Sequence, residues 1–364
     1  MRSPCNTTFQ QMLQGDSRMR KAIELDRIGA VVIGRNEGER LRACLASANS
    51  TGVRVVYVDS GSTDGSAALA RSLGVHVVEL DASLPFSAAR ARNAGSEAAM
   101  ELRPETRYVQ FVDGDCELAE GWPHRAVREL ETHPDVAVVC GRVRERDPGC
   151  SIYSRLCDME WSAAMGDIDA CGGIFMVRGD AFREAGRFNA SIVAGEEPEL
   201  CLRLRQAGWR ILRIDSDMAV HDGAMTRFGQ WWRRSVRCGY GYAVGNAMYG
   251  NTPARHYVRE TRSNWAWGLI VPTALLALTA LVSVWSPALA VVYPLWAVKV
   301  ARYRRMAYRD GWGDALLYGA FCMLGKFPMV WGQLRFVRNR LTGQTAGDRT
   351  FAWSSMGVPD DNQG

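Results

Sequence analysis

Tyr108-Val-Gln-Phe-Val-Asp-Gly-Asp115 is an apolar run that stops on two carboxylates separated by one glycine. A run of this kind predicts a buried strand with Asp113 and Asp115 at its carboxyl end. Open α/β sheets bind ligands beyond the carboxyl ends of their strands, which makes both acids candidate ligand residues. Carboxylate oxygens suit Mg²⁺ or Mn²⁺, and these cations commonly bind one or two carboxylates together with the phosphates of a substrate. Because Asp and Gly also form solvated turns, the motif alone leaves both interpretations open.

Strands and helices are predicted to alternate on both sides of this stretch. Apolar runs predict strands and residues at helical spacing predict helices, in the order strand 28–33, helix 37–48, strand 53–58, helix 66–73, strand 75–80 and helix 88–102. Beyond residue 116, helices are expected at 122–132 and 196–208 and strands at 136–140, 210–214 and 218–220, with an apolar run at 169–177. The alternation predicts an α/β fold with a mostly parallel sheet flanked by helices.

The loop Asp59-Ser-Gly-Ser-Thr-Asp-Gly-Ser66 connects a predicted strand to a predicted helix. Its small residues allow a ligand to approach the backbone, and Asp64 is placed to cap the helix. A purely structural role as turn and cap explains these residues equally well. A parallel sheet would, however, place Asp59 at the same edge as Asp113. A nucleoside bound by the loop would then have its phosphates near the two acids.

Five motifs occur along the chain. They are Asn36-Glu37, the loop 59–64, Arg92-Asn93-Ala-Gly95, Asp113-Gly-Asp115 and a segment that runs from Glu196-Glu197-Pro-Glu-Leu200 to Gly208-Trp209. In this order they resemble the family-2 glycosyltransferases with the GT-A fold, over residues 28–221. The resemblance implies that the chain moves a sugar from a nucleoside diphosphate sugar to an acceptor.

The resemblance also implies a role for each motif. Contacts to the nucleotide sugar would come from Asn36, Glu37, Asp59, Ser60, Asp64, Arg92, Asn93, Asp113, Gly172 and Gly173. Asp113 and Asp115 would hold a divalent cation, Mg²⁺ or Mn²⁺, on the diphosphate. His221 would be a further metal or phosphate ligand, although a lone histidine is more often structural. Trp161 and the Cys171-Gly-Gly173 region would contact the acceptor and the donor sugar, although Trp161 could equally belong to the core.

An acid in the last motif is the catalytic base in that family. We place the base at Glu197 and, second, at Glu196. This chain departs from the family pattern there, because Glu replaces the more usual Asp and Pro198 follows at once. Proline is tolerated at the first position of a helix. The acids also have a structural interpretation, since negative charge near the start of a helix stabilises it.

Inverting glycosyl transfer explains why these residue types are needed. An acceptor hydroxyl attacks the anomeric carbon while a carboxylate removes its proton, and a metal neutralises charge on the departing diphosphate. Glycoside hydrolysis, in contrast, typically needs two carboxyl groups that flank the bond. A sugar nucleotidyltransferase is the alternative enzyme class, but Gly34-Arg-Asn-Glu37 is not the glycine-rich basic loop that it would carry. A non-catalytic nucleotide-sugar-binding membrane subunit is the third possibility.

A long segment without charge follows the predicted enzyme. No Asp, Glu, Lys or Arg occurs from Asn264 to Val298, and residues 265–285 are long enough to span a bilayer of about 30 Å. A return helix at 288–303 would leave the following arginines on the cytosolic side, next to the catalytic domain, as the positive-inside tendency expects. A third segment, 312–331, contains Asp314 and Lys326, so we expect an interfacial or re-entrant helix there. The alternative is a buried helical hairpin in a soluble protein.

Gln230-Trp-Trp-Arg-Arg234 partly resembles the Gln-x-x-Arg-Trp motif of processive family members. Arg234 stands where the final tryptophan would be, which argues against a polymerising enzyme. An interfacial helix over 228–236 explains the stretch better, with tryptophans at the level of the lipid headgroups and arginines on anionic lipid. The expected partners are therefore a membrane-presented glycan or lipid-linked acceptor and membrane lipid, at the inner (cytoplasmic) membrane.

Composition sets the domain boundaries and excludes some functions. The expected regions of the 364 residues are an N-terminal tail at 1–26, a GT-A catalytic domain at 27–245, a linker at 246–263, a membrane-associated helical region at 264–340 and a C-terminal tail at 341–364. The tail at 1–26 lacks the apolar run of a signal peptide. Ten scattered cysteines fit a reduced cytosolic domain better than a disulfide framework. Nucleic acid is not an expected partner, because the sequence has no zinc module and no aromatic-basic platform.

Overall fold

The structure, a computed structural model, describes residues 25–162, 164–281 and 286–343. Both predicted tails lie almost entirely outside the described residues. The chain divides into two compact units. Unit 1 holds residues up to 144 together with 164–189 and 197–222, and unit 2 holds 145–162, 190–196 and the residues from 223 onward.

Unit 1 is built from alternating strands and helices. Its elements are β1 (Ile28–Gly34), α2 (Glu39–Ser50), β2 (Arg54–Asp59), α3 (Ser66–Ser72), β3 (His76–Glu79), α4 (Ala88–Leu102), β4 (Tyr108–Asp113), β5 (Cys116–Leu118), α5 (Trp122–Thr132), β6 (Val136–Glu145), β7 (Gly166–Asp167), β8 (Phe175–Arg178), α7 (Gly179–Glu184), α8 (Glu196–Gln206) and β9 (Arg210–His221). The first and last residues of a few elements fall at the boundary with unit 2. The predicted α/β fold with a sheet flanked by helices is confirmed.

The sheet contains nine strands among the described residues, and its order is β3-β2-β1-β4-β8-β6-β9-β5 with β7 paired to β9. Strands β3, β2, β1 and β4 pair with one another in parallel, as the sequence predicts. The pairs β4–β8, β6–β8, β5–β9 and β7–β9 are antiparallel. The prediction of a mostly parallel sheet is therefore wrong for the whole sheet, which is mixed, with parallel pairing confined to the N-terminal part. The later strands are not joined by regular crossover helices, and they are free to pair in the antiparallel sense.

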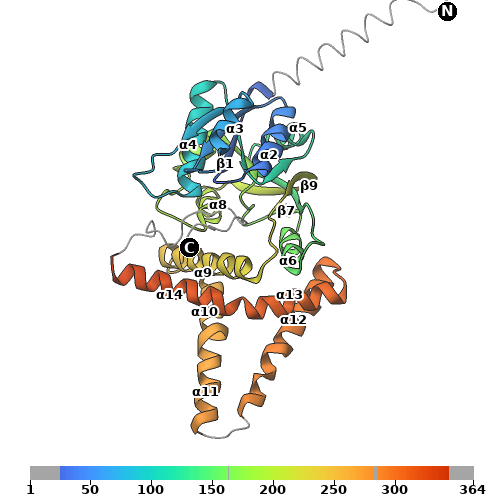
Figure 1. Cartoon of the computed structure of the whole chain (residues 1–364), viewed down its shortest axis with the longest axis vertical. Helices are drawn as coiled ribbons and strands as arrows, with labels where there is room; N and C mark the ends of the chain where they lie inside the picture. The colour runs from blue at the N-terminus through green and yellow to red at the C-terminus, as the bar shows by residue number, and fades with distance from the viewer. Residues whose placement is uncertain (1–24, 163, 282–285, 344–364) are drawn as a thin grey trace, which may run out of the picture. The chain divides into compact units, whose positions relative to one another are not determined.

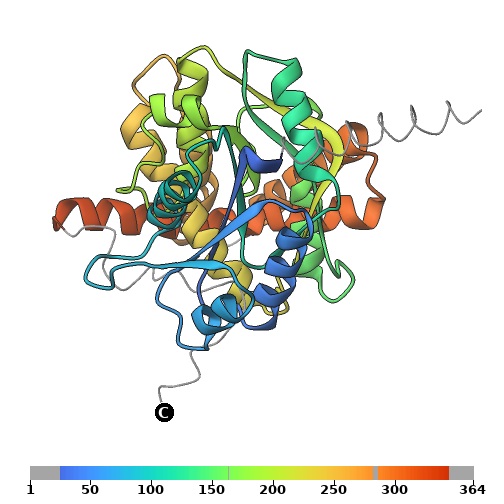
Figure 2. The same cartoon turned by 90° about the horizontal axis from the view of Figure 1, so that it is seen from above.

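Strand β1 lies at the centre of the core. All seven of its residues are buried, because α4 and α2 lie on either side of it (Figures 1 and 2). Helix α4 approaches most closely at Gly95. A Cβ on that residue would overlap Val31 Cγ1 and would lie 2.8 Å from Val58 Cγ2. The glycine of the Arg92-Asn93-Ala-Gly95 motif is therefore required by packing, and it lets Arg92 reach the edge of the sheet.

Replacing Gly95 by alanine is expected to destabilise the protein. Overpacking a core costs about 1–3 kcal/mol, whereas the better helix propensity of alanine returns at most about 1 kcal/mol. The melting temperature of the purified protein in detergent should therefore fall. Gly313→Ala is the matched control, because no atom lies within 4 Å of the Cβ that it would add. Equal melting temperatures for the two variants would show that α4 is not held this closely against β1.

Unit 2 is helical. Its elements include α6 (Ile152–Trp161), α9 (Phe228–Tyr249), α10 (Val258–Trp265), a π-helical turn (Ala266–Ile270), α11 (Val271–Leu281), a 3₁₀ turn (Ser286–Val291), α12 (Val292–Tyr308), α13 (Trp312–Leu324) and α14 (Lys326–Leu341). Helices α9 and α14 lie side by side (Figure 1), and glycines at positions 239 and 332 allow their backbones to touch.

The interfacial interpretation of 228–236 is wrong for one of the two tryptophans. Trp231 is only 5% exposed and packs with Cys157 and Met225 in a hydrophobic cluster, while Trp232 packs against this cluster from outside. Arg234 forms an ion pair with Glu160, 2.6 Å away. The helix continues to Tyr249 and buries one face against α14, so the first tryptophan belongs to the core of unit 2.

Within the part of unit 2 that the structure describes, two helical stretches are long and apolar enough to cross a membrane. They are Val258–Leu281 and Trp312–Leu341, and 11% and 39% of their most apolar parts are buried. Figure 1 shows α11, the apolar end of the first stretch, and α12 as two arms that diverge from each other. None of the residues of α11 is buried. Residues 282–285 of the predicted span 265–285 lie outside the described residues.

Candidate active site

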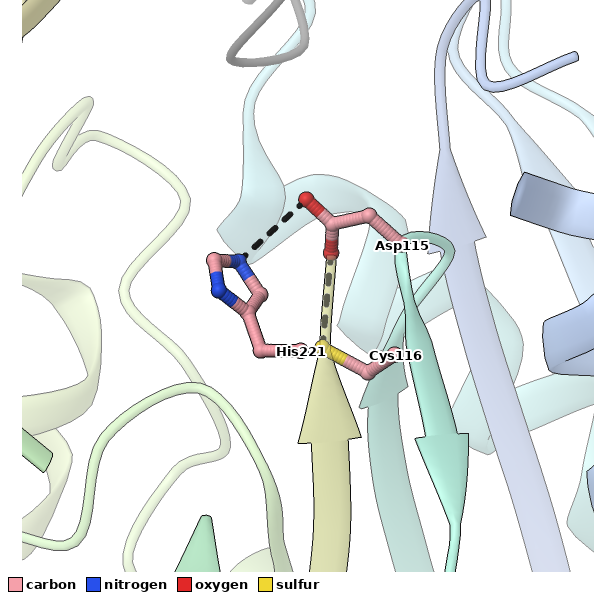
Figure 3. Close-up of side chains that lie close together, drawn as sticks. All are labelled: Asp115, Cys116 and His221. Carbon is pink, nitrogen blue, oxygen red and sulfur yellow. Dashed lines mark hydrogen bonds and ion pairs between the residues drawn. The ribbon is translucent and has the colours of Figure 1, made fainter. Parts of the chain in front are cut away.

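The two predicted acids lie where three strands of unit 1 meet. Strand β4 ends at Asp113, and β5 begins at Cys116 and pairs with the end of β9, so that Cys116 is opposite His221. The backbone N–H of Asp222 donates a hydrogen bond of 2.8 Å to the carbonyl of Asp115. This pairing brings the imidazole beside the carboxylate, with His221 Nε2 3.4 Å from Asp115 Oδ2 (Figure 3).

Negative charge is concentrated at this edge. Glu37 is 5% exposed and forms an ion pair of 2.9 Å with Arg40. Burial, reinforced by the charge of Asp115 and opposed by Arg40, raises the pKa of Glu37 to about 8. Burial also raises the pKa of Asp113, although Arg92 counteracts it. Burial opposes ionisation of Asp115 too, but the adjacent His221 outweighs it and lowers the pKa of Asp115.

Arg92 joins Asp113 to the glycine segment that follows β7. Its Nη2 donates hydrogen bonds to Asp113 Oδ1 at 2.7 Å and to the carbonyl of Gly173 at 3.4 Å. A Cβ on Gly173 would lie 2.6 Å from Asp113 Oδ2, so no other residue fits without moving the ion pair. Gly172 has a φ of 86°, which L side chains rarely adopt. The glycines predicted as sugar contacts thus adjoin the acid of the metal motif.

The loops predicted to bind the nucleotide are tied to each other. Asn36, with a φ of 57°, accepts a hydrogen bond at Oδ1 from the N–H of Thr63 at 2.7 Å. Asp59 Oδ2 accepts from the N–H groups of Gly61 and Ser62 at 3.0 and 2.8 Å, and Asp64 accepts at Oδ1 from the N–H of Ser66 at 3.0 Å and at Oδ2 from that of Gly38 at 3.0 Å. The side chains therefore shape the loops.

Ser60 is buried and Asn93 is half-buried in the same part of unit 1. Asn93 accepts from the N–H of Phe188 at 3.1 Å and donates to its carbonyl at 2.8 Å, which pins α4 to the loop after α7. The Arg92 guanidinium lies 5.5 Å from the centre of the Phe188 ring. Ser60 is 1% exposed, and its N–H donates to the carbonyl of Gly34 at 3.1 Å. The Arg92-Asn93 pair thus orders the surroundings of Asp113.

The carboxylate of Glu197 accepts hydrogen bonds from two cysteines. Glu197 is in the first turn of α8 and 5% exposed. Its Oε1 accepts hydrogen bonds from the N–H of Cys171 at 2.7 Å and from the thiols of Cys171 and Cys201, both at 3.0 Å. Glu199 has a different role, because it is buried and bound by Arg203 at 2.8 Å. Glu196, the second candidate base, is half-buried and belongs to unit 2.

The segment Cys171-Gly-Gly173 connects the two halves of the site. At one end it donates to Glu197, and at the other its carbonyl accepts from Arg92, which holds Asp113. Two Cα–Cα steps span at most about 7.6 Å. The candidate base and the candidate metal acid are therefore neighbours.

Trp161 lies in unit 2. Its Nε1 donates to Glu145 Oε1 at 2.8 Å, and Glu145 Oε2 accepts from the N–H of Gly223 at 3.3 Å. Trp161 is half-buried. Whether it contacts a sugar remains a prediction.

Sequence reasoning missed Cys201 and Arg40 at the site, and it placed Cys171 in a segment that contacts the sugars but not beside Glu197. Cys201 is four residues after Glu197, and this spacing places both side chains on one face of a helix, which was a usable signal. Arg40, in the first turn of α2, pairs with Glu37 just before that helix, and its Nη1 also donates to the carbonyl of Asp222 at 3.2 Å. Cys171 is in a loop, and no local pattern identifies it as a neighbour of Glu197.

Comparison with known proteins identifies relatives of the chain. The model of Glycosyl transferase family 2 matches residues 30–163, and the model of Glycosyl transferase family group 2 matches residues 108–303. Pre-mycofactocin glycosyltransferase of Mycobacterium tuberculosis is 27% identical over 249 residues, which are 64% of this chain and 48% of that protein. Succinoglycan biosynthesis protein ExoA of Rhizobium meliloti is 26% identical over 225 residues, which are 57% of this chain and 63% of that protein. The chain thus spans less than two thirds of either relative.

A solved structure supports the fold. The mannosyltransferase PcManGT from Pyrobaculum calidifontis, in complex with GDP-Man and Mn²⁺, superimposes with a TM-score of 0.59 at 18% sequence identity. The match covers 86% of this chain and 88% of that chain, so the similarity extends beyond the sheet.

Proposed function

Because the chain belongs to glycosyl transferase family 2, we propose that it moves a sugar from a nucleoside diphosphate sugar to an acceptor hydroxyl with inversion at the anomeric carbon. The observation that carries this proposal is the connection of Glu197 to Asp113 through Cys171-Gly-Gly173. A proton acceptor and a diphosphate site must lie on opposite sides of one sugar ring, and two acids held at the two ends of one three-residue segment suit that purpose. A sugar nucleotidyltransferase has no comparable need for a base at this place.

A divalent cation fits the acidic edge. Glu37, Asp113 and Asp115 lie together at this edge, and burial raises the pKa of Glu37 and of Asp113, so a cation bound beside them would favour their ionised forms. Asp113 and Asp115 offer the oxygen ligands that Mg²⁺ and Mn²⁺ prefer, and the imidazole of His221 suits Mn²⁺ better than Mg²⁺. When bound there, the cation would neutralise charge on the leaving diphosphate.

Glu197 is the proposed general base, with Glu196 second. Its three hydrogen-bond donors fix Oε1, so the carboxylate keeps one orientation while the acceptor hydroxyl loses its proton to it. Arg92 holds the carboxylate of Asp113 in place, and Asp113 would face the diphosphate of the donor. The tied loops that carry Asn36, Asp59, Ser60 and Asp64 form the wall against which the nucleoside would lie.

A ligand-binding panel tests the donor and the cation together. We expect one of UDP-, GDP- or dTDP-sugars to raise the melting temperature, and Mn²⁺ to increase that shift, because a ligand that binds only the folded state stabilises it by mass action. Calorimetry gives the dissociation constant with and without Mn²⁺. No shift with any of the donors would overturn the proposal, whereas binding without transfer to any acceptor would favour a non-catalytic subunit.

The acceptor is proposed to be presented at a membrane, as a glycan or a lipid-linked acceptor. The chain would be held in the inner (cytoplasmic) membrane with unit 1 in the cytosol. The exposed leucines of α11 support this, since Leu276 is 71% and Leu281 84% exposed in a helix without charge. Apolar surface of this size on a helix is typical of contact with lipid or another protein.

Charged substitutions in α11 test the membrane anchor in the full-length chain. Wild type should sediment with membranes and resist carbonate extraction. The double substitution Leu276→Arg and Leu281→Arg should increase the extracted fraction, because an arginine at the centre of a spanning helix costs about 2.5–3.5 kcal/mol. Leu84→Arg is the control, a 55% exposed leucine in unit 1. A wild-type protein found wholly in the soluble fraction would refute the anchor.

A further inference from the structure

In the glycosyl transfer described above, the cysteines around Glu197 serve only as hydrogen-bond donors to its carboxylate. Glu197 and Cys201 are one helical turn apart on α8, and Cys171 approaches them from the loop after β7. One oxygen and two sulfur atoms, one from each residue, lie within 4.8 Å of one another. The three possible ligand atoms thus lie around one small volume in unit 1.

The spacing of these atoms is that of a metal site. Zinc bonds to thiolate at about 2.3 Å, so the tetrahedral angle sets two sulfur ligands about 3.8 Å apart. The Cys171 and Cys201 sulfur atoms are 3.7 Å apart. A disulfide would need them at about 2.05 Å. A zinc-bound carboxylate oxygen would be about 3.5 Å from each sulfur, against 3.0 Å to each of them now, so the carboxylate must retreat by about half an ångström.

We propose that Cys171, Glu197 and Cys201 form a binding site for Zn²⁺, and that zinc bound there blocks glycosyl transfer by occupying the carboxylate. The binding stands on the geometry alone, whereas the inhibition rests on the proposed function of Glu197. Soft thiolates select zinc over Mg²⁺ and Mn²⁺. The two clusters of unit 1 would therefore bind different cations. Asp113 and Asp115 would bind Mg²⁺ or Mn²⁺ through oxygen, and the cysteines would bind zinc through sulfur.

Zinc binding is an exchange of cations without oxidation or reduction. Burial raises the pKa of Cys171 well above its usual range, so without metal its thiol is protonated and donates to Glu197. A hydrogen bond with Cys171 lowers the pKa of Cys201, but burial and the neighbouring Glu197 carboxylate together outweigh it and raise that pKa to about 11. As zinc binds, each thiol releases its proton to solvent and its sulfur lone pair forms the bond to the metal. Two protons therefore leave for each zinc, and the affinity rises with pH.

Cobalt reports on thiolate ligands directly. Full-length protein in detergent, freed of metal and kept reduced by a non-thiol reductant, is titrated with Co²⁺ while the thiolate-to-cobalt charge-transfer absorption is recorded. We expect one equivalent of Co²⁺ to produce this absorption and Zn²⁺ to abolish it. Cys171→Ser and Cys201→Ser should each weaken binding by at least about tenfold, because loss of even an indirect metal contact has that effect. Cys171→Ala and Cys201→Ala serve if a serine variant misfolds.

Cys116→Ser is the matched control, because Cys116 lies with Asp115 and His221 in the other cluster of possible ligands. Absorption that is lost only in this variant, or that persists in the Cys171 and Cys201 variants, would overturn the proposed site. In wild type, release of two protons per Zn²⁺ in weakly buffered solution is expected, and release of none would overturn it as well.

Transfer assays in Mn²⁺ separate the site from its consequence. We expect Zn²⁺ to inhibit wild type, with an inhibition constant at least about tenfold higher in any serine variant that retains activity. If zinc produces the proton release and displaces cobalt but leaves transfer unchanged, the site stands and the inhibition is refuted. Glu197 would then not be the base. If the protein fails to bind cobalt but still transfers sugar through Glu197, the metal site is refuted and the proposed function of Glu197 stands.

Discussion

Glu197→Gln is expected to lower kcat by about a hundredfold to ten-thousandfold, the contribution of a positioned general base, while the dissociation constant of the donor changes little. Glutamine keeps the shape of the side chain and can still accept the N–H of Cys171, which is 2.7 Å from Oε1. The substitution therefore removes proton acceptance and leaves the local fold in place. Steady-state kinetics give kcat, and calorimetry gives the donor affinity.

Glu196→Gln is the matched control for this experiment. The two residues are adjacent at the start of α8, and both changes remove one negative charge from that helix end. Their structural effect through the helix dipole should thus be similar, about 0.3–1 kcal/mol. If Glu196→Gln abolishes transfer and Glu197→Gln does not, the base is the neighbouring residue. If both variants remain fully active, neither carboxylate removes the proton.

Asp115→Asn is expected to remove most of the effect of Mn²⁺ on nucleotide binding and to lower kcat/KM by about two to three orders of magnitude. A bound cation contributes several kcal/mol to a transition state with growing negative charge, and each 1.36 kcal/mol corresponds to about a tenfold change in rate. The asparagine retains the size of the side chain but offers a neutral, weaker ligand. Calorimetry with and without Mn²⁺ measures the first effect, and transfer kinetics the second.

Asp217→Asn controls for the loss of one negative charge. Asp217 is on the same strand as His221, is 57% exposed and pairs with Arg142 at 3.1 Å, so its removal leaves the acidic edge intact. An exposed ion pair contributes about 0–1 kcal/mol, and activity should stay near that of wild type. A Mn²⁺ effect that is undiminished in Asp115→Asn would exclude this residue as a ligand. His221→Gln should show a smaller loss if the imidazole is a secondary ligand.

Local patterns predicted the regular part of unit 1 well. The prediction of a helix at 122–132 is confirmed by α5, and the four parallel strands are found as expected because continuous apolar runs mark strands buried on both faces. The helix expected at 37–48 begins two residues later, after Gly38 with a φ of 55°. An adjacent glycine and charged residues at a helix start leave its first residue ambiguous in sequence.

Strand β9 was not predicted as one element. The residues Asp215-Ser-Asp217 separate the two short strands that the sequence indicates. In the structure they continue a single strand, Arg210–His221, because Arg142 of the neighbouring strand β6 binds both aspartates, at 2.5 and 3.1 Å. Polar residues are tolerated on the exposed face of a strand, and the partner that supplied the arginine is 73 or more residues away.

The sequence by itself determined the α/β class, the parallel strands, the order of the five motifs and the uncharged segment, since each depends on residues close together in the chain. The tertiary structure determined the contacts between residues that are far apart in the sequence. It placed His221 beside Asp115 through antiparallel pairing, put Trp231 in a core rather than at a membrane surface, and brought Cys171 to Glu197. Such contacts join residues separated by tens of positions. They depend on strand register and close packing, for which a local pattern carries no information.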